Sequence, residues 1–174
     1  MTNLYSSFHP PSLKYNRLLL VAGIITGGIL LGLWRPYTPI PAPSETFETI
    51  SGQPIQLSSL IGKPVLITFW ATDCPACVRE IPHLIDLYQQ YHAKGLEIIA
   101  VSMYYDIPSH VVEMTRMKQI PYPVTLDISA QHAKAFGQVM LTPTTFLIDA
   151  KGIILDKFIG KLPNTIASQI EHLL

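Results

Sequence analysis

Residues 64–77 read PVLITFWATDCPAC and contain both cysteines of the 174-residue chain, Cys74 and Cys77. The unbroken apolar run over 64–70 predicts a strand that is buried on both faces. Apolar residues then recur every three to four positions over 75–93, which predicts a helix directly after the cysteines. A strand, a CxxC pair and a helix in this order are typical of a redox-active thiol pair.

The spacing of the two cysteines favours chemistry over a structural role. A disulfide that closes so short a loop restricts the unfolded chain very little, so it would add little to the stability of the fold. At the first turn of a helix, the positive end of the helix dipole favours the reactive thiolate. Half of a zinc site or a pair of inert thiols is the alternative, although the chain has no second CxxC pair and no histidine at zinc-finger spacing.

Length and composition limit the remaining possibilities. A chain of 174 residues can hold one domain with a full core and one appendage. The formal net charge is zero, with 12 basic and 12 acidic residues and no basic stripe, so the sequence does not predict nucleic-acid binding. The most apolar part of the chain is the candidate for the appendage.

An uncharged segment over 18–34 predicts a single transmembrane helix. Lys14 and Arg17 precede it, which places the N-terminus in the cytoplasm, and Trp34 suits the outer interface. A cleaved signal peptide is the alternative. Both readings carry the rest of the chain out of the cytoplasm.

Four regions follow from this organisation. We expect a cytoplasmic tail over 1–17, the anchor over 18–34, a proline-rich extended spacer over 35–45, and a folded domain over 46–174. Within the domain, alternating or unbroken apolar runs predict a hairpin over 47–57 and strands over 64–70, 96–102, 122–126, 144–149 and 153–159. Helices are predicted over 75–93, kinked at Pro82, and over 108–118, 129–136 and 163–174, the third capped by Ser129. This order predicts an α/β fold with a mixed sheet and helices on both faces.

Several motifs together resemble one family. They are residues 62–77 with Glu80-Ile81-Pro82, the strand EIIAVS over 97–102, and LTPTTFLID over 141–149. This set is similar to the membrane-anchored thioredoxin-like proteins of the TlpA/ResA group, over residues 46–174. The resemblance implies a thioredoxin-like fold and thiol–disulfide exchange.

The resemblance also implies roles for individual residues. Cys74 corresponds to the attacking thiol and Cys77 to the thiol that resolves the mixed disulfide. Pro143 corresponds to the family's cis-proline, and it would place the backbone of Thr142 opposite Cys74, where an extended substrate could pair with it. Glu80 corresponds to an acid that could carry a proton or raise the pKa of the thiols.

Trp70 is expected to contribute to the wall of the substrate site, and Tyr104 and Tyr105 could line the same groove. Two positions depart from the family pattern. Asp73 stands directly before the first cysteine, where the group commonly has tryptophan, and its charge opposes formation of the thiolate. Thr68 stands where thioredoxin has a buried aspartate, so this position cannot act as a base.

These features predict an extracytoplasmic thiol–disulfide oxidoreductase that works mainly as a reductase. The resemblance implies disulfide-containing protein substrates, a thiol-reductant transporter in the membrane as electron donor, and a role in cytochrome c maturation or periplasmic thiol maintenance. It also implies a single-pass protein of the bacterial inner membrane with its domain in the periplasm. We expect no cofactor or metal. The alternatives are a disulfide oxidase or isomerase, and a copper(I)-binding module in which Met140 could add a ligand.

Overall fold

Six strands form a mixed sheet in the order β1-β8-β7-β4-β5-β6 in the computed structural model, which describes residues 21–22 and 38–174. The strands are β1 (Ile40–Pro41), β4 (Val65–Trp70), β5 (Glu97–Ser102), β6 (Val124–Leu126), β7 (Thr144–Ile148) and β8 (Ile153–Ile159). β4, β5 and β6 run parallel, whereas β7 is antiparallel to both β4 and β8. Strand β4, which leads to the cysteines, therefore lies between β5 and β7 near the middle of the sheet.

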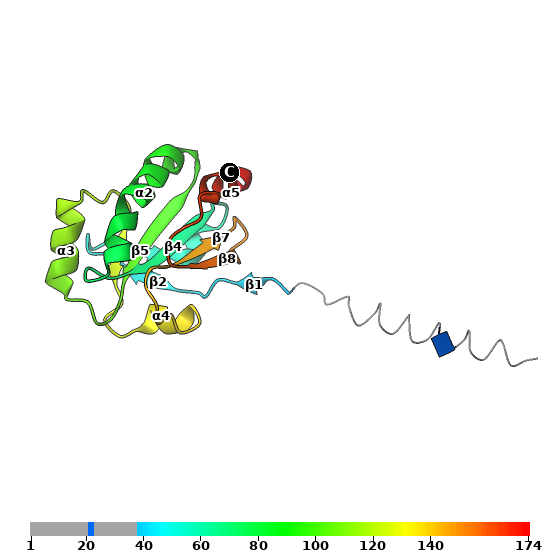
Figure 1. The fold of residues 1–174 in the computed structure, drawn as a ribbon, viewed down its shortest axis with the longest axis horizontal. Coiled ribbons are helices and arrows are strands. Elements are labelled where there is room, and N and C mark those ends of the chain that lie inside the picture. Colours follow the sequence, from blue (N-terminus) through cyan, green and yellow to red (C-terminus); the bar gives the residue numbers. More distant parts are fainter. Residues whose placement is uncertain (1–20, 23–37) are drawn as a thin grey trace, which may run out of the picture. The chain divides into compact units, whose positions relative to one another are not determined.

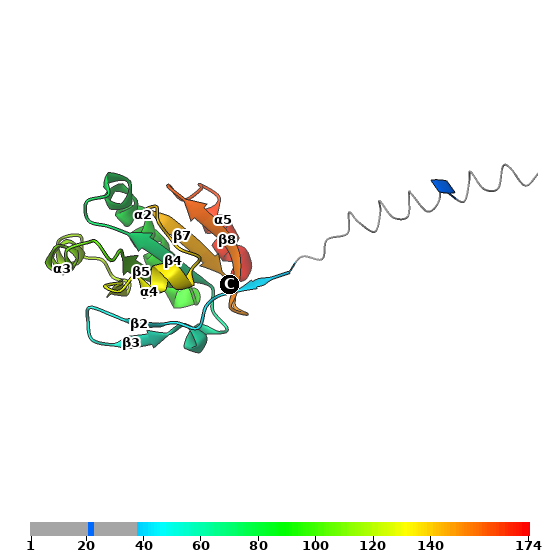
Figure 2. The same cartoon turned by 90° about the horizontal axis from the view of Figure 1, so that it is seen from below.

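Helices cover both faces of this sheet. They are α2 (Pro75–Tyr91), α3 (Pro108–Met117), α4 (Gln131–Ala135) and α5 (Ile166–Leu173), with short 3₁₀ turns η1 (Leu57–Leu60) and η2 (His92–Lys94). In Figures 1 and 2, α2 and α5 lie on one face, and α4 lies on the other beside the hairpin of β2 (Thr46–Glu48) and β3 (Pro54–Gln56). The α/β fold with a mixed sheet is confirmed.

Alternating side chains of the buried strands supply two separate cores. Leu66, Ile98 and Leu147 point into the core beneath α2 and α5. Their neighbours Ile67 and Ile99 point into the opposite core, which α4 and the hairpin cover. Because successive side chains of a strand face opposite sides, a run that is almost wholly apolar suits a strand that is buried on both faces. This explains why all six residues of β4 are buried.

The first boundary of the folded unit differs from the prediction. Ile40 and Pro41 form strand β1, which pairs with Ile154 and Ile153 of β8. The amide of Ala42 then donates to the carbonyl of Gly152 at 2.8 Å. The folded unit therefore spans Pro39–Leu174 and begins earlier than the boundary predicted at residue 46.

The predicted anchor lies almost wholly outside the described residues. The tail over 1–17 and most of the segment over 18–34 fall in the part of the chain that the structure does not describe. Within the described residues, no helix has the length and apolar character needed to cross a membrane.

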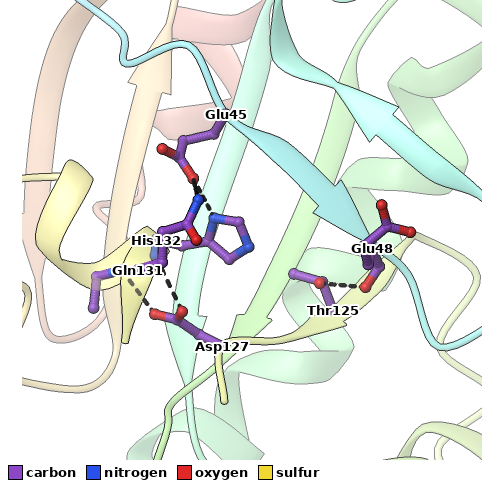
Figure 3. Close-up of polar contacts among 7 residues, drawn as sticks. Glu45, Glu48, Thr125, Asp127, Gln131 and His132 are labelled. Atoms are coloured by element: carbon purple, nitrogen blue, oxygen red, sulfur yellow. Dashed lines mark hydrogen bonds and ion pairs between the residues drawn. The ribbon is translucent and has the colours of Figure 1, made fainter. Parts of the chain in front are cut away.

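Helix α4 begins with a cap that differs from the predicted one. Asp127 accepts hydrogen bonds from the backbone amides of His132 at 3.0 Å and Ala133 at 2.8 Å (Figure 3). Ser129 makes no such bond, and Ala130, the residue before the helix, has a left-handed backbone with φ of 56°. The chain makes a turn between residues 127 and 130. The capping carboxylate therefore comes from Asp127, three residues before the N-cap position, Ala130, where a capping side chain usually stands.

The same corner fixes the hairpin to the sheet. His132 Nδ1 lies 2.6 Å from Glu45 Oε2, just before β2, and the rings of His132 and Phe47 lie 4.7 Å apart. The hydroxyl of Thr125 on β6 donates to the backbone carbonyl of Glu48 on β2 (Figure 3). These contacts join the hairpin, β6 and α4 into one block.

Helix α2 continues through Pro82, which was expected to kink it. It ends at Tyr91, and η2 then leads to Gly95, where the backbone has φ of 123°. The remaining predicted helices and strands form within a few residues of their expected bounds.

Candidate functional site

The two cysteines lie at the first turn of α2 and form a disulfide, with a Cα–Cα distance of 5.3 Å. Cys74 is the N-cap residue, and its sulfur accepts the backbone N–H of Cys77 at 3.2 Å. Cys74 is partly exposed, whereas Cys77 is only 3% exposed and packs in the core. The sulfur that an external thiol or disulfide can reach is therefore that of Cys74.

A loop before β7 lies opposite Cys74. The Thr142–Pro143 peptide bond is cis, and the carbonyl oxygen of Thr142 lies 3.6 Å from the sulfur of Cys74. The hydroxyl of Thr144 donates to the carbonyl of Leu141, and Gly160 donates to the carbonyl of Pro143, so the loop is held from both sides. Sequence reasoning placed Thr142 and Pro143 here, and the structure brings both residues to the disulfide.

Glu80 follows Cys77 by three residues and shares its face of α2. Its side chain is buried, and Oε1 accepts the amide of Leu162 at 2.9 Å. The second oxygen, Oε2, is buried and has no hydrogen-bond partner, and His83 Nδ1 lies 3.8 Å from Oε1. A buried polar atom usually has a hydrogen-bond partner, so this unpaired oxygen is unusual in the interior of the domain.

A cavity of about 570 Å³ opens next to Glu80. It is lined by Ala76, Arg79, Glu80, Pro82, His83, Asp86, Lys161 and Asn164. Burial is the main cause that raises the pKa of Tyr122, and the charge of Glu80 raises it further. Tyr122 therefore stays neutral beside the carboxylate.

Three further predicted positions lie as follows. Trp70 is only 4% exposed and belongs to the core, so it offers little surface to a substrate. Thr68 is buried, and its hydroxyl accepts that of Thr145 on β7 at 3.0 Å, so no titrating group lies at this position. Asp73 is exposed beside Cys74.

One contact of the site escaped sequence reasoning. Asp106, in the loop after β5, accepts hydrogen bonds from both the amide and the hydroxyl of Thr72, at 2.7 and 2.6 Å. One signal could have indicated this contact. β4 and β5 are parallel neighbours, so the loops that follow them, which carry Thr72 and Asp106, lie at the same edge of the sheet. Asp106 ends the turn that carries Tyr104 and Tyr105, both of which are exposed.

The arrangement suits exchange of a disulfide between this chain and a partner. It has an accessible sulfur at a helix N-terminus, a second sulfur bonded to it, and the backbone carbonyl of Thr142 opposite. Within the described residues, no group of three or more histidine, cysteine, aspartate or glutamate side chains could hold a metal ion.

The comparisons agree with this geometry. A redoxin family profile matches residues 39–174. A thiol-disulfide oxidoreductase ResA of Bacillus cereus (strain ZK / E33L) is 33% identical over 160 residues, which cover 86% of this chain and 91% of the relative. ResA of Bacillus subtilis (strain 168) is 32% identical over 135 residues, covering 76% of this chain and 73% of the relative.

Solved structures support the same assignment. The crystal structure of a thiol:disulfide interchange protein of the thioredoxin family from Chlorobium tepidum TLS matches with a TM-score of 0.73 and 26% identity. That match covers 80% of this chain and 99% of the other. The chain belongs to the redoxin family and is a ResA-like thiol–disulfide oxidoreductase of the thioredoxin fold.

Proposed function

We propose that this chain is a membrane-anchored, extracytoplasmic enzyme that reduces disulfides in other proteins. Thiol–disulfide exchange at Cys74 and Cys77 follows from the family, and the direction and location are the proposal. The observation that carries the direction is the charge around the pair. Asp73 directly precedes Cys74, Glu80 shares a helix face with Cys77, and Asp106 binds Thr72 two residues before Cys74.

These carboxylates favour a reducing pair. A nearby negative charge disfavours a thiolate, and a pair whose reduced form is less stable passes its electrons on more readily. The N-terminus of α2 and the N–H of Cys77 act in the opposite direction, because both stabilise a thiolate at Cys74. We expect the three carboxylates to outweigh these dipoles, which gives the cysteine pair a reduction potential in the range of reductases.

The proposed reaction has two exchange steps. The Cys74 thiolate attacks one sulfur of the substrate disulfide, which forms a mixed disulfide and releases the first substrate thiolate. The Cys77 thiolate then attacks the Cys74 sulfur, which closes the Cys74–Cys77 disulfide and releases the second. The substrate gains two electrons and, on protonation of both thiolates, two protons. In this reaction, Glu80 accepts the proton of Cys77; its position on the same helix face supports this role.

Regeneration requires an electron donor. The oxidised pair must receive two electrons before the next turnover, and the proposed source is a thiol-reductant transporter in the membrane. The uncharged segment over 18–34, with Lys14 and Arg17 before it, supports a single-pass anchor in the bacterial inner membrane and a periplasmic domain. Apocytochrome c and other periplasmic thiol proteins are the proposed substrates.

The reduction potential of the full-length protein tests the direction. Purified protein is equilibrated with dithiothreitol or glutathione buffers, and the thiols are trapped and counted. A potential at or below about −250 mV supports a reductase, and one near −120 mV would make the protein an oxidase. Glu80→Gln is expected to raise the potential by roughly 30 mV, equal to tenfold in the exchange equilibrium.

Location is tested separately in cells. Spheroplasts that express the full chain are treated with a protease that cannot cross the membrane. Loss of the domain from intact spheroplasts, with the chain retained in the membrane fraction after alkaline extraction, supports the proposal. Protection of the domain until the spheroplasts are lysed would contradict it.

A further inference from the structure

We propose that Asp106 is a positioning residue for the exchange reaction, acting on Cys74 through the peptide group between Ala71 and Thr72. The inference rests on thiol–disulfide exchange at Cys74 and is independent of the direction of electron flow and of location. It begins from the turn that joins β4 to α2. This turn determines where the reactive sulfur lies.

The Ala71–Thr72 peptide group is held at both of its ends. Its N–H, which belongs to Thr72, donates to Asp106 Oδ2 at 2.7 Å. Its carbonyl oxygen, which belongs to Ala71, accepts the backbone N–H of Cys74 at 3.3 Å. A chain of two hydrogen bonds therefore runs from the Asp106 carboxylate through one peptide group to the backbone of Cys74.

Asp106 uses both oxygens of its carboxylate in these contacts. Oδ2 accepts the amide of Thr72, and Oδ1 accepts the amide of Ile107 at 2.9 Å as well as the Thr72 hydroxyl at 2.6 Å. Backbone amides can only donate, so both oxygens must act as acceptors. An asparagine at this position would turn its NH₂ group toward one of the two amides and lose that bond.

The backbone of the same residue closes the turn that follows β5. The amide of Asp106 donates to the carbonyl of Met103, and the amide of Met103 donates to the carbonyl of Trp70. The turn between them carries Tyr104 and Tyr105, whose rings contact each other edge to face at 5.3 Å. Asp106 thus joins two turns: its backbone amide closes the turn of these exposed tyrosines, and its carboxylate holds the turn before Cys74.

Asp106→Asn tests the proposal in the full-length protein, and Glu113→Gln is the matched control. Glu113 lines the same small cavity as Thr72 and Asp73, and no hydrogen bond joins it to Asp106, Thr72 or Cys74. The control therefore removes a nearby charge and leaves the Asp106 contacts intact. Two rates are measured: reduction of insulin disulfides at pH 7, and alkylation of reduced Cys74 by iodoacetamide as a function of pH.

We expect Asp106→Asn to slow insulin reduction by about tenfold or more, as misplacement of a reacting group does. Its alkylation midpoint should nevertheless move to lower pH by about half a unit, because a negative charge near the thiolate is lost. A slower reaction with more thiolate present indicates lost positioning, since a purely electrostatic role would leave the rate unchanged or raise it. Glu113→Gln should change the insulin rate less than twofold.

Thr72 provides a second test if Asp106→Asn folds poorly. Thr72→Val removes the hydroxyl bond to Asp106, and Thr72→Ser keeps it, so the serine variant should retain several-fold more activity than the valine variant. The proposal is overturned if Asp106→Asn matches Glu113→Gln in rate, or if it lowers only the free energy of unfolding. A wild-type protein that oxidises rather than reduces would contradict the proposed function alone, because the same variants can be compared in either direction.

Discussion

Cys74 and Cys77 differ in exposure although they are one helical turn apart. Cys74 caps α2 and faces the loop of Thr142, whereas Cys77 is buried against the core. An external thiol or disulfide can therefore reach only Cys74, and Cys77 can act only on a sulfur already attached to Cys74. The order of the two exchange steps follows from this difference.

Replacement of each cysteine separately should reveal that order. Cys77→Ser is expected to accumulate mixed disulfides between Cys74 and client proteins, since no second thiol can resolve them. Cys74→Ser should form few or none, because Cys77 is buried. Non-reducing electrophoresis of cell extracts, with reduced samples in parallel, measures the adducts; equal amounts in both variants would refute the assignment of roles.

Tyr122 should make the fold sensitive to alkaline pH. Its pKa is raised in the folded state by burial first and by Glu80 second. Above about pH 10 the unfolded chain ionises this tyrosine while the folded chain does not, so stability is full below that pH and falls as pH rises. Tyr122→Phe should reduce the loss of unfolding free energy in urea titrations between pH 9 and 11.

The exposed Tyr104 gives the matched control for this measurement. Tyr104→Phe should leave the alkaline slope as it is in the unaltered protein. Tyr88 and Tyr91 also have raised pKa values, from burial and from the hydrogen bond to Glu171 respectively, so Tyr122→Phe should remove only part of the slope. An unchanged slope in Tyr122→Phe would show that this tyrosine does not contribute.

The sequence identified most of the site residues but could not find Asp106. Cys74, Cys77 and Glu80 belong to one continuous motif, and Pro143 belongs to a second that resembles a known family. Asp106 contacts Thr72 across 34 positions of the chain, through a loop that has no motif of its own. Such a contact depends on how two strands pair, which local patterns do not specify.

At the scale of elements, helix α4 shows why a cap can be misplaced from sequence. Ser129 stands just before the apolar residues of this helix and suits a cap by residue type. The structure instead uses Asp127, because Ala130 turns into the left-handed region and brings the earlier carboxylate over the helix end. An alanine carries no signal for that conformation.

Two alanine variants should separate the predicted cap from the observed one. Asp127→Ala leaves two buried amides, those of His132 and Ala133, without their acceptor, so we expect a loss of about 1–3 kcal/mol of unfolding free energy. Ser129→Ala should cost less than about 0.5 kcal/mol. Urea denaturation followed by circular dichroism measures both free energies of unfolding. A larger loss in Ser129→Ala than in Asp127→Ala would show that Ser129 is the cap of α4.

At the scale of the whole molecule, the strands were the most predictable part. Unbroken apolar runs with β-branched residues indicate buried strands, and five of the predicted ones form the sheet. Strand β1 was missed because Ile40 and Pro41 lie among alternating prolines, a composition typical of extended linkers. Its pairing with β8 becomes visible only once β8 has its place in the sheet.

Truncation tests where the folded unit begins. A chain that starts at Pro39 should unfold in a single transition. One that starts at Thr46 lacks the pairing of β1 with β8 and the bond from Ala42 to Gly152, and it should melt several degrees lower. Calorimetry of both chains measures the difference, and equal melting temperatures would mean that β1 adds no stability.

The short strand β1 has one more consequence, which concerns encounters between copies of the protein. Without it, β8 would expose a row of unpaired backbone groups, a template on which other chains can polymerise by strand addition. β1 covers part of that row, and a two-residue strand containing Pro41 offers little for a further strand to pair with. At the opposite side of the sheet, Thr49 bridges to Thr125 of β6. Each edge of the sheet is thus partly covered, which lowers the chance that copies of the protein join edge to edge.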